Sequence, residues 1–299
     1  MTASPTAVPT SVLPVSPTPI VLPNDAQINA PSGSVVWAVV GGTRLFSSTD
    51  RGDAWQERPL RTDPTGNGQV SFVDDREGWV SVVGAPATGC QAQLVAIWHT
   101  GDAGSTWQQL AGDGLGFNGC KGALRFADRS TGYLAAYRPL LIYFTVTGGA
   151  GWAPSRPLAD PPGFTTSVGA NELVPGALRV FGAVVLADVT GQSTHYAYRS
   201  SDGGATWTYA STAPNQLDAI AFVTATRWLQ IGAPGASKET MDAGATWHAF
   251  VTDYQQAAPV APAITFGDAQ VGYATVRGAI QRTIDGGAHW TAIGTPGTF

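Results

Sequence analysis

One octapeptide recurs six times along the 299 residues, and this repeat constrains the fold more than any other feature of the chain. Its consensus is Ser/Thr, any residue, Asp, any residue, Gly, any residue, Thr and Trp. The copies occupy 48–55, 100–107, 145–152, 200–207, 240–247 and 283–290. Their third positions are 52, 45, 55, 40 and 43 residues apart in turn. Six copies at such a period predict the blades of a β-propeller.

A second repeat precedes most copies of the octapeptide. It has the form Phe-x-Asp-x-x-x-x-Gly-Trp/Tyr and occurs within 70–80, 124–134 and 264–274, with a shortened version at 220–228. Each copy is typical of a strand, a polar turn and a second strand that opens with Gly and an aromatic residue. Together with the two strands that flank the octapeptide, this gives four antiparallel strands per repeat. The sequence therefore predicts an all-β, six-bladed propeller with blades at about 25–60, 68–112, 121–158, 172–212, 216–252 and 260–296.

Composition agrees with this fold and excludes several function classes. Charged residues make up 12% of the chain, against roughly 25% in an average protein. The 37 Gly and 10 Trp favour short strands and tight turns over long helices. With 16 basic and 21 acidic residues, the chain lacks the basic clusters that nucleic-acid binding needs. No apolar run reaches the roughly 18 residues of a membrane span.

The N-terminal residues 1–24 differ in composition from the rest. They are rich in Thr, Pro, Ser and Val, which predicts an extended, disordered stalk before a single propeller domain at 25–299. A Met directly before such a stretch favours a secreted precursor whose signal was removed. The alternative is an ordinary N-terminus with a loose tail. We therefore expect an extracytoplasmic protein, secreted or attached to lipid or wall through the stalk.

Two cysteines point to the same compartment. Cys90 and Cys120 both lie in Gly-rich loop sequence rather than in apolar strand runs. Paired loop cysteines are typical of a disulfide in an oxidising compartment. The alternative is a pair of unlinked thiols.

The octapeptide is identified as the Asp-box, the bacterial neuraminidase repeat. In this motif the Asp carboxylate can accept hydrogen bonds from turn N–H groups, Gly permits a positive φ, and Trp packs on the turn. We expect structural roles for the Asp-box residues Asp50, Asp102, Asp202, Asp242, Asp285, Trp55, Trp107, Trp207, Trp247 and Trp290. The alternative, a ring of aspartates that binds a metal or catalyses hydrolysis, is disfavoured because one Asp per blade leaves them far apart. No metal or other cofactor is predicted.

The strand order places two kinds of connection on opposite faces. Turns between strands one and two, and the Asp-box turns, share one face, here the turn face. Loops between strands two and three, and connections between blades, share the other, here the loop face. The long segments 58–68, 111–122, 156–175 and 251–262 all belong to the loop face, where binding residues usually lie. We expect a protein or carbohydrate ligand there, and a monomer.

Two families resemble this chain. The Phe-x-Asp-x-x-x-x-Gly-Trp/Tyr unit followed by an Asp-box resembles the photosystem II stability/assembly factor-like propellers, which implies an exported, non-catalytic binding or assembly protein. Sialidases are similar in architecture, which implies as the alternative a glycoside hydrolase for an anionic sugar. An anion site would then use Arg44, Arg125, Arg179 and Arg277, whereas the competing interpretation is four unrelated arginines.

The candidates for catalytic carboxylates are Glu172, Asp188 and Asp253, which we expect on the loop face. No Tyr can be paired with Glu172 from the sequence. His195 lies near the same face beside Asp188, whereas the other three histidines fall in or beside Asp-boxes. No zinc-ligand spacing is present.

Overall fold

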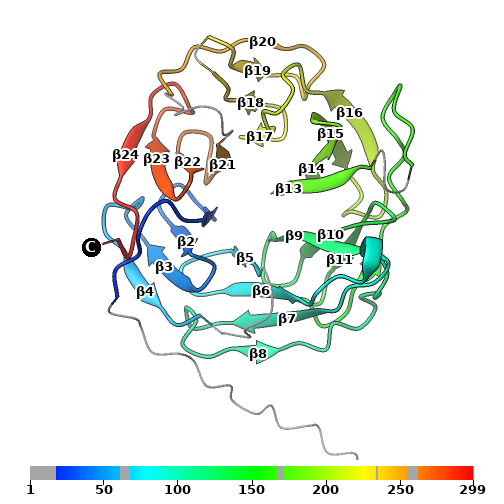
Figure 1. Cartoon of the computed structure of the whole chain (residues 1–299), viewed down its shortest axis with the longest axis horizontal. Coiled ribbons are helices and arrows are strands. Elements are labelled where there is room, and N and C mark those ends of the chain that lie inside the picture. Colours follow the sequence, from blue (N-terminus) through cyan, green and yellow to red (C-terminus); the bar gives the residue numbers. More distant parts are fainter. Residues whose placement is uncertain (1–17, 61–67, 168–171, 234, 255–261, 299) are drawn as a thin grey trace, which may run out of the picture.

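A computed structural model describes residues 18–60, 68–167, 172–233, 235–254 and 262–298. In these ranges, 24 strands form six antiparallel sheets of four strands, with one short 3-10 helix. Figure 1 shows the six sheets arranged in a ring around a central axis. The predicted six-bladed, all-β propeller is therefore confirmed.

Each blade is built from one continuous stretch of sequence, with its strands in sequence order from the axis to the rim. Blades 1 and 2 comprise β1 (Ala26–Asn29), β2 (Val36–Val40), β3 (Arg44–Ser48), β4 (Gln56–Arg58), β5 (Gln69–Phe72), β6 (Gly78–Val83), β7 (Val95–Thr100) and β8 (Gln108–Gln109), with helix η1 (Thr88–Cys90) between β6 and β7. Blades 3 and 4 comprise β9 (Cys120–Phe126), β10 (Gly132–Tyr137), β11 (Leu141–Thr145), β12 (Ala153–Pro154), β13 (Val174–Phe181), β14 (Val184–Gly191), β15 (Thr194–Ser200) and β16 (Thr208–Thr212). Blades 5 and 6 comprise β17 (Ala221–Phe222), β18 (Trp228–Gln230), β19 (Lys238–Thr240), β20 (His248–Ala249), β21 (Ala263–Phe266), β22 (Gly272–Val276), β23 (Ala279–Thr283) and β24 (Thr291–Ile293).

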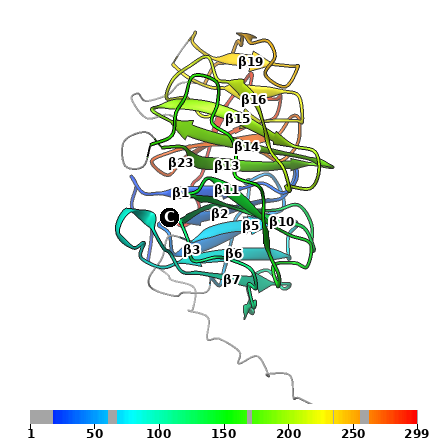
Figure 2. The same ribbon diagram turned by 90° about the vertical axis from the view of Figure 1, so that its right-hand side faces the viewer.

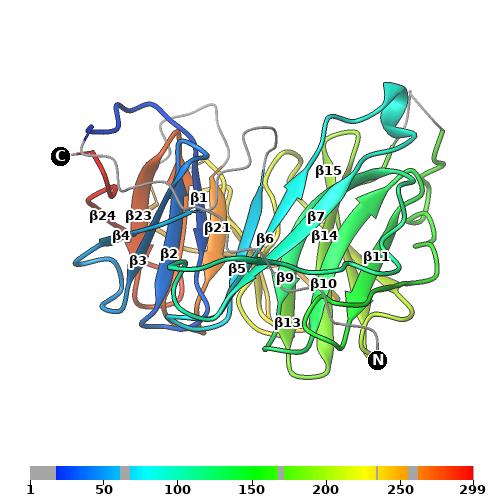
Figure 3. The same cartoon turned by 90° about the horizontal axis from the view of Figure 1, so that it is seen from below.

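The two faces of the ring are visible in the side views. Strand ends and connections gather at two opposite faces in Figures 2 and 3, and η1 projects from one of them in Figure 3. Because η1 joins strands two and three of blade 2, that face is the loop face.

The second repeat has a direct role in packing between blades. The ring of Trp37 in blade 1 stacks on Phe72 of blade 2, with centroids 3.6 Å apart. Trp79 of blade 2 stacks in the same way on Phe126 of blade 3 at 3.9 Å. A Cβ on Gly132 would lie 2.5 Å from the Phe126 ring, so only glycine leaves room for this stack. The Phe and Gly of the repeat thus belong to one interblade contact.

Each octapeptide forms a hydrogen-bonded turn. In blade 4, Asp202 Oδ1 accepts the N–H of Thr206 at 3.0 Å, and Oδ2 accepts its hydroxyl at 2.6 Å. The Ser200 hydroxyl donates to Asp202 and accepts the N–H of Gly204, whose φ is 94°. In blade 3, Thr147 replaces the Asp, and its Oγ1 accepts the N–H of Gly151 at 2.9 Å. One oxygen in this position is therefore enough to close the turn.

Within the described residues, the ring closes between blades 6 and 1 without a shared strand. Arg282 of β23 donates to the carbonyl of Arg51 and to the carboxylate of Asp53, both in the octapeptide of blade 1. Residues 18–24, which the sequence assigns to the stalk, lie against this junction. The N–H of Ile20 donates to the carbonyl of Gly297, and the N–H of Asn24 donates to that of Arg277.

The remainder of the predicted stalk, residues 1–17, lies outside the described residues. Among the helices of the described part, none has the length and apolar character to cross a membrane.

Candidate functional site in the central channel

The innermost strands of the six blades enclose a cavity of about 370 Å³ on the axis. Its lining comes from β1, β5, β9, β13 and β21, from Ile220 and Phe222 of blade 5, and from Thr275 of β22. Each inner strand begins at the loop face, and the cavity lies near these first residues. We therefore call it the loop-side cavity. A second cavity of about 430 Å³, the turn-side cavity, lies at the other ends of the inner strands. Both volumes fall within the range of small-ligand sites.

Arg125 and Arg179 belong to the linings of both cavities and therefore separate them. Arg125 follows the buried Leu124 on β9, and Arg179 follows the buried Leu178 on β13. Because side chains alternate along a strand, each arginine lies on the opposite face of its strand from the preceding leucine. Both arginines line the channel cavities.

Arg179 reaches past blade 5 to the inner strand of blade 6. One guanidinium nitrogen donates to the carbonyl of Phe266, and another lies 3.5 Å from the hydroxyl of Thr265, both on β21. Arg179 thereby links blade 4 to blade 6, past the two-residue inner strand of blade 5. Its Nε is buried without a partner.

The guanidinium of Arg125 has no hydrogen bond or ion pair with any residue that the structure describes, and its Nε is buried without a partner. Burial lowers the pKa of Arg125 to about 10. Burial also lowers the pKa of Arg179, and the positive charge of Arg125 lowers it further. Two guanidinium groups that repel each other in an enclosed space form a site that an anion would stabilise.

The other two predicted arginines lie elsewhere. Arg44 forms an ion pair with Glu57 on the neighbouring strand, through Nε at 2.7 Å and Nη2 at 2.5 Å. Arg277 lies in the turn between β22 and β23 with a positive φ of 51°. Neither residue lines a channel cavity. Of the four predicted arginines, the structure brings Arg125 and Arg179 together and places Arg44 and Arg277 elsewhere.

The three candidate carboxylates are also dispersed. Glu172 forms an ion pair with Arg138 at the loop face. Asp188 is 2% exposed and binds His195 at 2.9 Å. Asp253 accepts the N–H of Trp290 at 2.8 Å, so it lies against the octapeptide turn of blade 6 and not at the loop-face position that we expected. None of the three lines the channel cavities.

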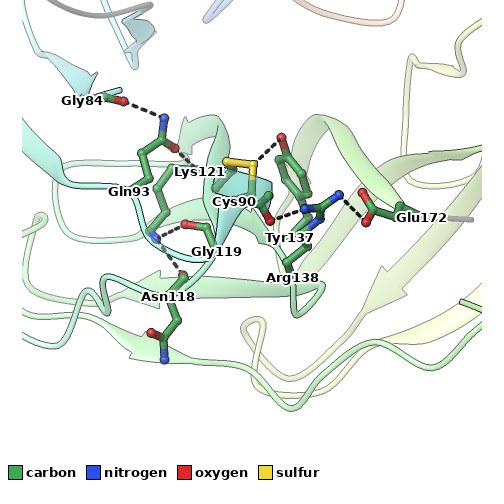
Figure 4. The surroundings of a disulfide bond; sticks show 11 residues. Gly84, Cys90, Gln93, Asn118, Gly119, Lys121, Tyr137, Arg138 and Glu172 are labelled. Carbon is green, nitrogen blue, oxygen red and sulfur yellow. Dashed lines mark hydrogen bonds and ion pairs between the residues drawn. A yellow bond between two sulfur atoms is a disulfide. The ribbon is translucent and has the colours of Figure 1, made fainter. Parts of the chain in front are cut away.

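Cys90 and Cys120 form a disulfide, as expected, with Cα atoms 5.1 Å apart. The bond joins η1 to the first residue of β9, and the Tyr137 hydroxyl donates to Cys90 Sγ at 3.3 Å (Figure 4). Nearby, the Gln93 side chain donates to the carbonyl of Gly84 and accepts the N–H of Lys121. These bonds tie the loop of blade 2 to the first strand of blade 3.

A third cavity, of about 520 Å³, lies beside this disulfide, between Cys90, Arg138, Leu140 and Leu173. Sequence reasoning missed it. Its walls come from four separate connections, and only the position of the two cysteines in loop sequence pointed toward this region.

The described fold has relatives of known structure. Residues 189–297 match the family model described as photosynthesis system II assembly factor YCF48. No curated protein sequence matches the chain. A structure of YCF48 bound to D1 peptide is 20% identical, with a TM-score of 0.53, and the alignment covers 97% of this chain and 88% of that one.

Two further structures align over most of the chain. YCF48 from Cyanidioschyzon merolae is 17% identical, with a TM-score of 0.54 over 92% of this chain and 86% of that one. Hadza microbial sialidase Hz136 is 12% identical, with a TM-score of 0.54 over 90% of this chain and 65% of that one. At these identities the alignments show the shared fold. The chain is thus a six-bladed β-propeller similar to the YCF48 assembly factors, and its residues 189–297 carry the match to their family model.

Proposed function

We propose that this chain is an exported, non-catalytic assembly propeller that holds a protein partner on its loop face, with an anionic group of the partner between Arg125 and Arg179. The observation that carries the proposal is the guanidinium of Arg125, which faces the channel without a bond to any described residue. A buried cation that lacks a carboxylate is costly, and a ligand that supplies one relieves the cost.

The charge around the two cavities favours entry from the loop face. Among the residues that the structure describes, none that lines the loop-side cavity is an Asp or a Glu. The turn-side cavity is lined by Asp128 and Asp268, which would repel an anion. An anionic group therefore reaches the arginines most easily through the loop-side cavity, whose walls are aliphatic with the amides of Gln27, Asn29 and Gln69.

A protein partner is supported by the similarity to YCF48, because one of the similar structures is of YCF48 with a D1 peptide. Export is supported by the disulfide, because such bonds persist mainly in oxidising compartments.

The alternative of a glycoside hydrolase is less well supported by the positions of the acidic groups. A retaining or inverting glycosidase needs two carboxyl groups within roughly 5–9.5 Å of each other beside the sugar. Here Glu172, Asp188 and Asp253 each bind another part of the protein, away from the channel arginines.

The test compares Arg125→Gln with Arg277→Gln, which removes the same charge from the loop face outside the channel. Each purified variant would be cross-linked in an extracytoplasmic extract of the source cells, and the linked peptides would be mapped by mass spectrometry. We expect one partner that cross-links to loop-face residues of the wild type and of Arg277→Gln, with at least a tenfold loss in Arg125→Gln. Equal cross-linking of both variants would contradict the channel site. Turnover of sialic or uronic acid glycosides that depends on Arg125 would replace the binding proposal with the hydrolase.

A further inference from the structure

Three amide side chains line the loop-side cavity, namely Gln27 and Asn29 on β1 and Gln69 on β5. The N–H of Val70 donates to Gln27 Oε1 at 3.1 Å, and the N–H of Phe72 donates to Asn29 Oδ1 at 2.9 Å. Because a backbone N–H only donates, it fixes which end of each amide faces the neighbouring strand. The oxygens of both β1 amides therefore face β5, and their nitrogens are left for other contacts.

The same constraint passes from Gln27 to Gln69. The oxygen of Gln27 is already bound, so its Nε2 donates to Gln69 Oε1, at 2.8 Å. This leaves Gln69 Nε2 without an acceptor among the residues that the structure describes, and Asn29 Nδ2 is in the same position. Neither nitrogen is fully enclosed by protein, so both are free to donate to a ligand in the cavity.

Contacts between neighbouring inner strands place Gln69 beside Arg125. Ser71 Oγ of β5 accepts the N–H of Phe126 of β9 at 2.8 Å. The inner strands of all blades run in the same direction, from the loop face to the turn face. Gln69 lies two residues before Ser71, and Leu124 lies two residues before Phe126. Gln69 is therefore level with Leu124, next to Arg125 on its loop-face side, and both Gln69 and Arg125 line the loop-side cavity.

The lining of this cavity favours a carboxylate carried on an apolar stem. The guanidinium of Arg125 supplies a positive charge, and a guanidinium binds a carboxylate through two parallel hydrogen bonds. Ile28, Val70, Ile220 and Ile264 contribute apolar walls to the same space of about 370 Å³. Such walls gain free energy when they cover carbon atoms, which a sulfate or phosphate ion does not offer.

We propose, on the basis of the binding function proposed above, that the loop-side cavity is a carboxylate pocket in which Asn29 and Gln69 determine specificity. Their amide nitrogens donate to the carboxylate oxygens that Arg125 binds. An uncharged amide of the same shape turns an NH₂ group toward these donors and is rejected. Gln27 is a positioning residue, because its bonds to Val70 and Gln69 set the direction of the Gln69 nitrogen. An acidic side chain of the protein partner and a free carboxylic acid present this same chemistry.

The test is an NMR titration of the full chain at pH 7 with isovalerate, isovaleramide and sulfate. The side-chain NH₂ signals of Asn29 and Gln69, assigned by comparison with Asn29→Asp and Gln69→Glu, report binding directly. The α-amide of N-acetylglutamate carries the carboxylate on a peptide side chain and separates the two sources.

Gln69→Glu is the decisive variant. It keeps an oxygen for the Gln27 nitrogen and replaces the free donor with a second oxygen. Gln270→Glu is the matched control, because it adds the same charge at an exposed position in the turn between β21 and β22.

We expect isovalerate to bind the wild type and Gln270→Glu with an affinity at least about tenfold higher than that of isovaleramide or sulfate. Both NH₂ signals should shift and reach saturation. In Gln69→Glu the preference should reverse toward isovaleramide, because the new carboxylate repels the acid and accepts from the amide. A purely structural role of Gln69 would weaken both ligands alike. Binding of the N-acetylglutamate amide assigns the pocket to a side chain of the partner, and binding of isovalerate without it assigns the pocket to a free acid.

Equal affinities for isovalerate and isovaleramide in the wild type, tighter binding of sulfate, or an unchanged preference in Gln69→Glu would each overturn the pocket. If Gln69→Glu fails to fold, the comparison of ligands on the wild type decides the question. The cross-linking experiment fails separately. A partner that depends on Arg125 together with no binding of isovalerate overturns the pocket alone, whereas binding of isovalerate without such a partner overturns the proposed function alone.

Discussion

Replacement of Cys90 and Cys120 by Ala tests how far the disulfide holds the loop face together. The bond closes a loop with a sequence separation of 30 residues. Chain entropy for a loop of this length corresponds to about 3.5 kcal/mol of stability. With about 2 °C per kcal/mol for a domain of this size, the melting temperature should fall by roughly 7 °C. Loss of the disulfide acts mainly by raising the conformational entropy of the unfolded chain. The β-sheet signal in circular dichroism of the folded variant should therefore stay unchanged.

The assay is urea unfolding of the oxidised wild type, the reduced wild type and the double Ala variant. The reduced wild type and the variant should agree with each other, and both should be less stable than the oxidised protein. The single variant Ser201→Ala, at an exposed octapeptide position far from the disulfide, should unfold like the oxidised wild type. Two free thiols in the untreated protein, or identical unfolding midpoints with and without reductant, would refute the reasoning.

Three other predictions concern the channel, the octapeptide turns and the interblade stack. Arg125→Met should raise the melting temperature, because it removes a buried charge without a described partner. The variant should also lose any stabilisation that added sulfate gives the wild type. A lower melting temperature would show that Arg125 is structural. Asp202→Ala should lower the melting temperature at pH 7 without loss of partner binding. Hydrogen bonds from the Thr206 hydroxyl and N–H, and then from Ser200, lower the pKa of Asp202 to about 2. The carboxylate therefore stabilises the folded protein above its ordinary pKa of 3.8, and this stabilisation is lost as the pH falls toward 2. The difference between wild type and variant should therefore shrink in acid, and a difference that is constant with pH would contradict this. Gly132→Ala should cost about 1–3 kcal/mol in urea unfolding, since the new Cβ would lie 2.5 Å from the Phe126 ring, whereas Gly182→Ala, with open space around it, should act only through its backbone conformation.

Much of the architecture follows from the sequence because the propeller is a local fold repeated six times. Each blade is made from consecutive strands, so an octapeptide such as 200–207 and a Phe-to-Gly unit such as 124–134 carry all the information needed to place their own strands. The expected blade limits agree with the strands that the structure shows, including the short inner strand Ala26–Asn29. The sequence predicts the disulfide correctly because Cys90, in the connection from β6 to β7, and Cys120, at the start of β9, both lie on the face that the strand order assigns to these connections.

The candidate site could be predicted only in part. Arg125 and Arg179 occupy equivalent positions of two inner strands, so the repeat itself places them near the axis. Arg44 and Arg277 also lie near strand ends, but the contacts of their side chains depend on neighbouring residues that no repeat specifies. Glu57 on the adjacent strand pairs with Arg44, and nothing in the spacing of the chain requires that contact.

Only the tertiary structure decided how the blades act on one another. The bond from Arg179 to Phe266 crosses from blade 4 to blade 6, and the contact of Asp253 with Trp290 crosses from blade 5 to blade 6. The sequence determined the blade, because its hydrogen bonds join residues a few positions apart. It did not determine the channel, because the charges and cavities there arise where six separate stretches of chain converge on one axis.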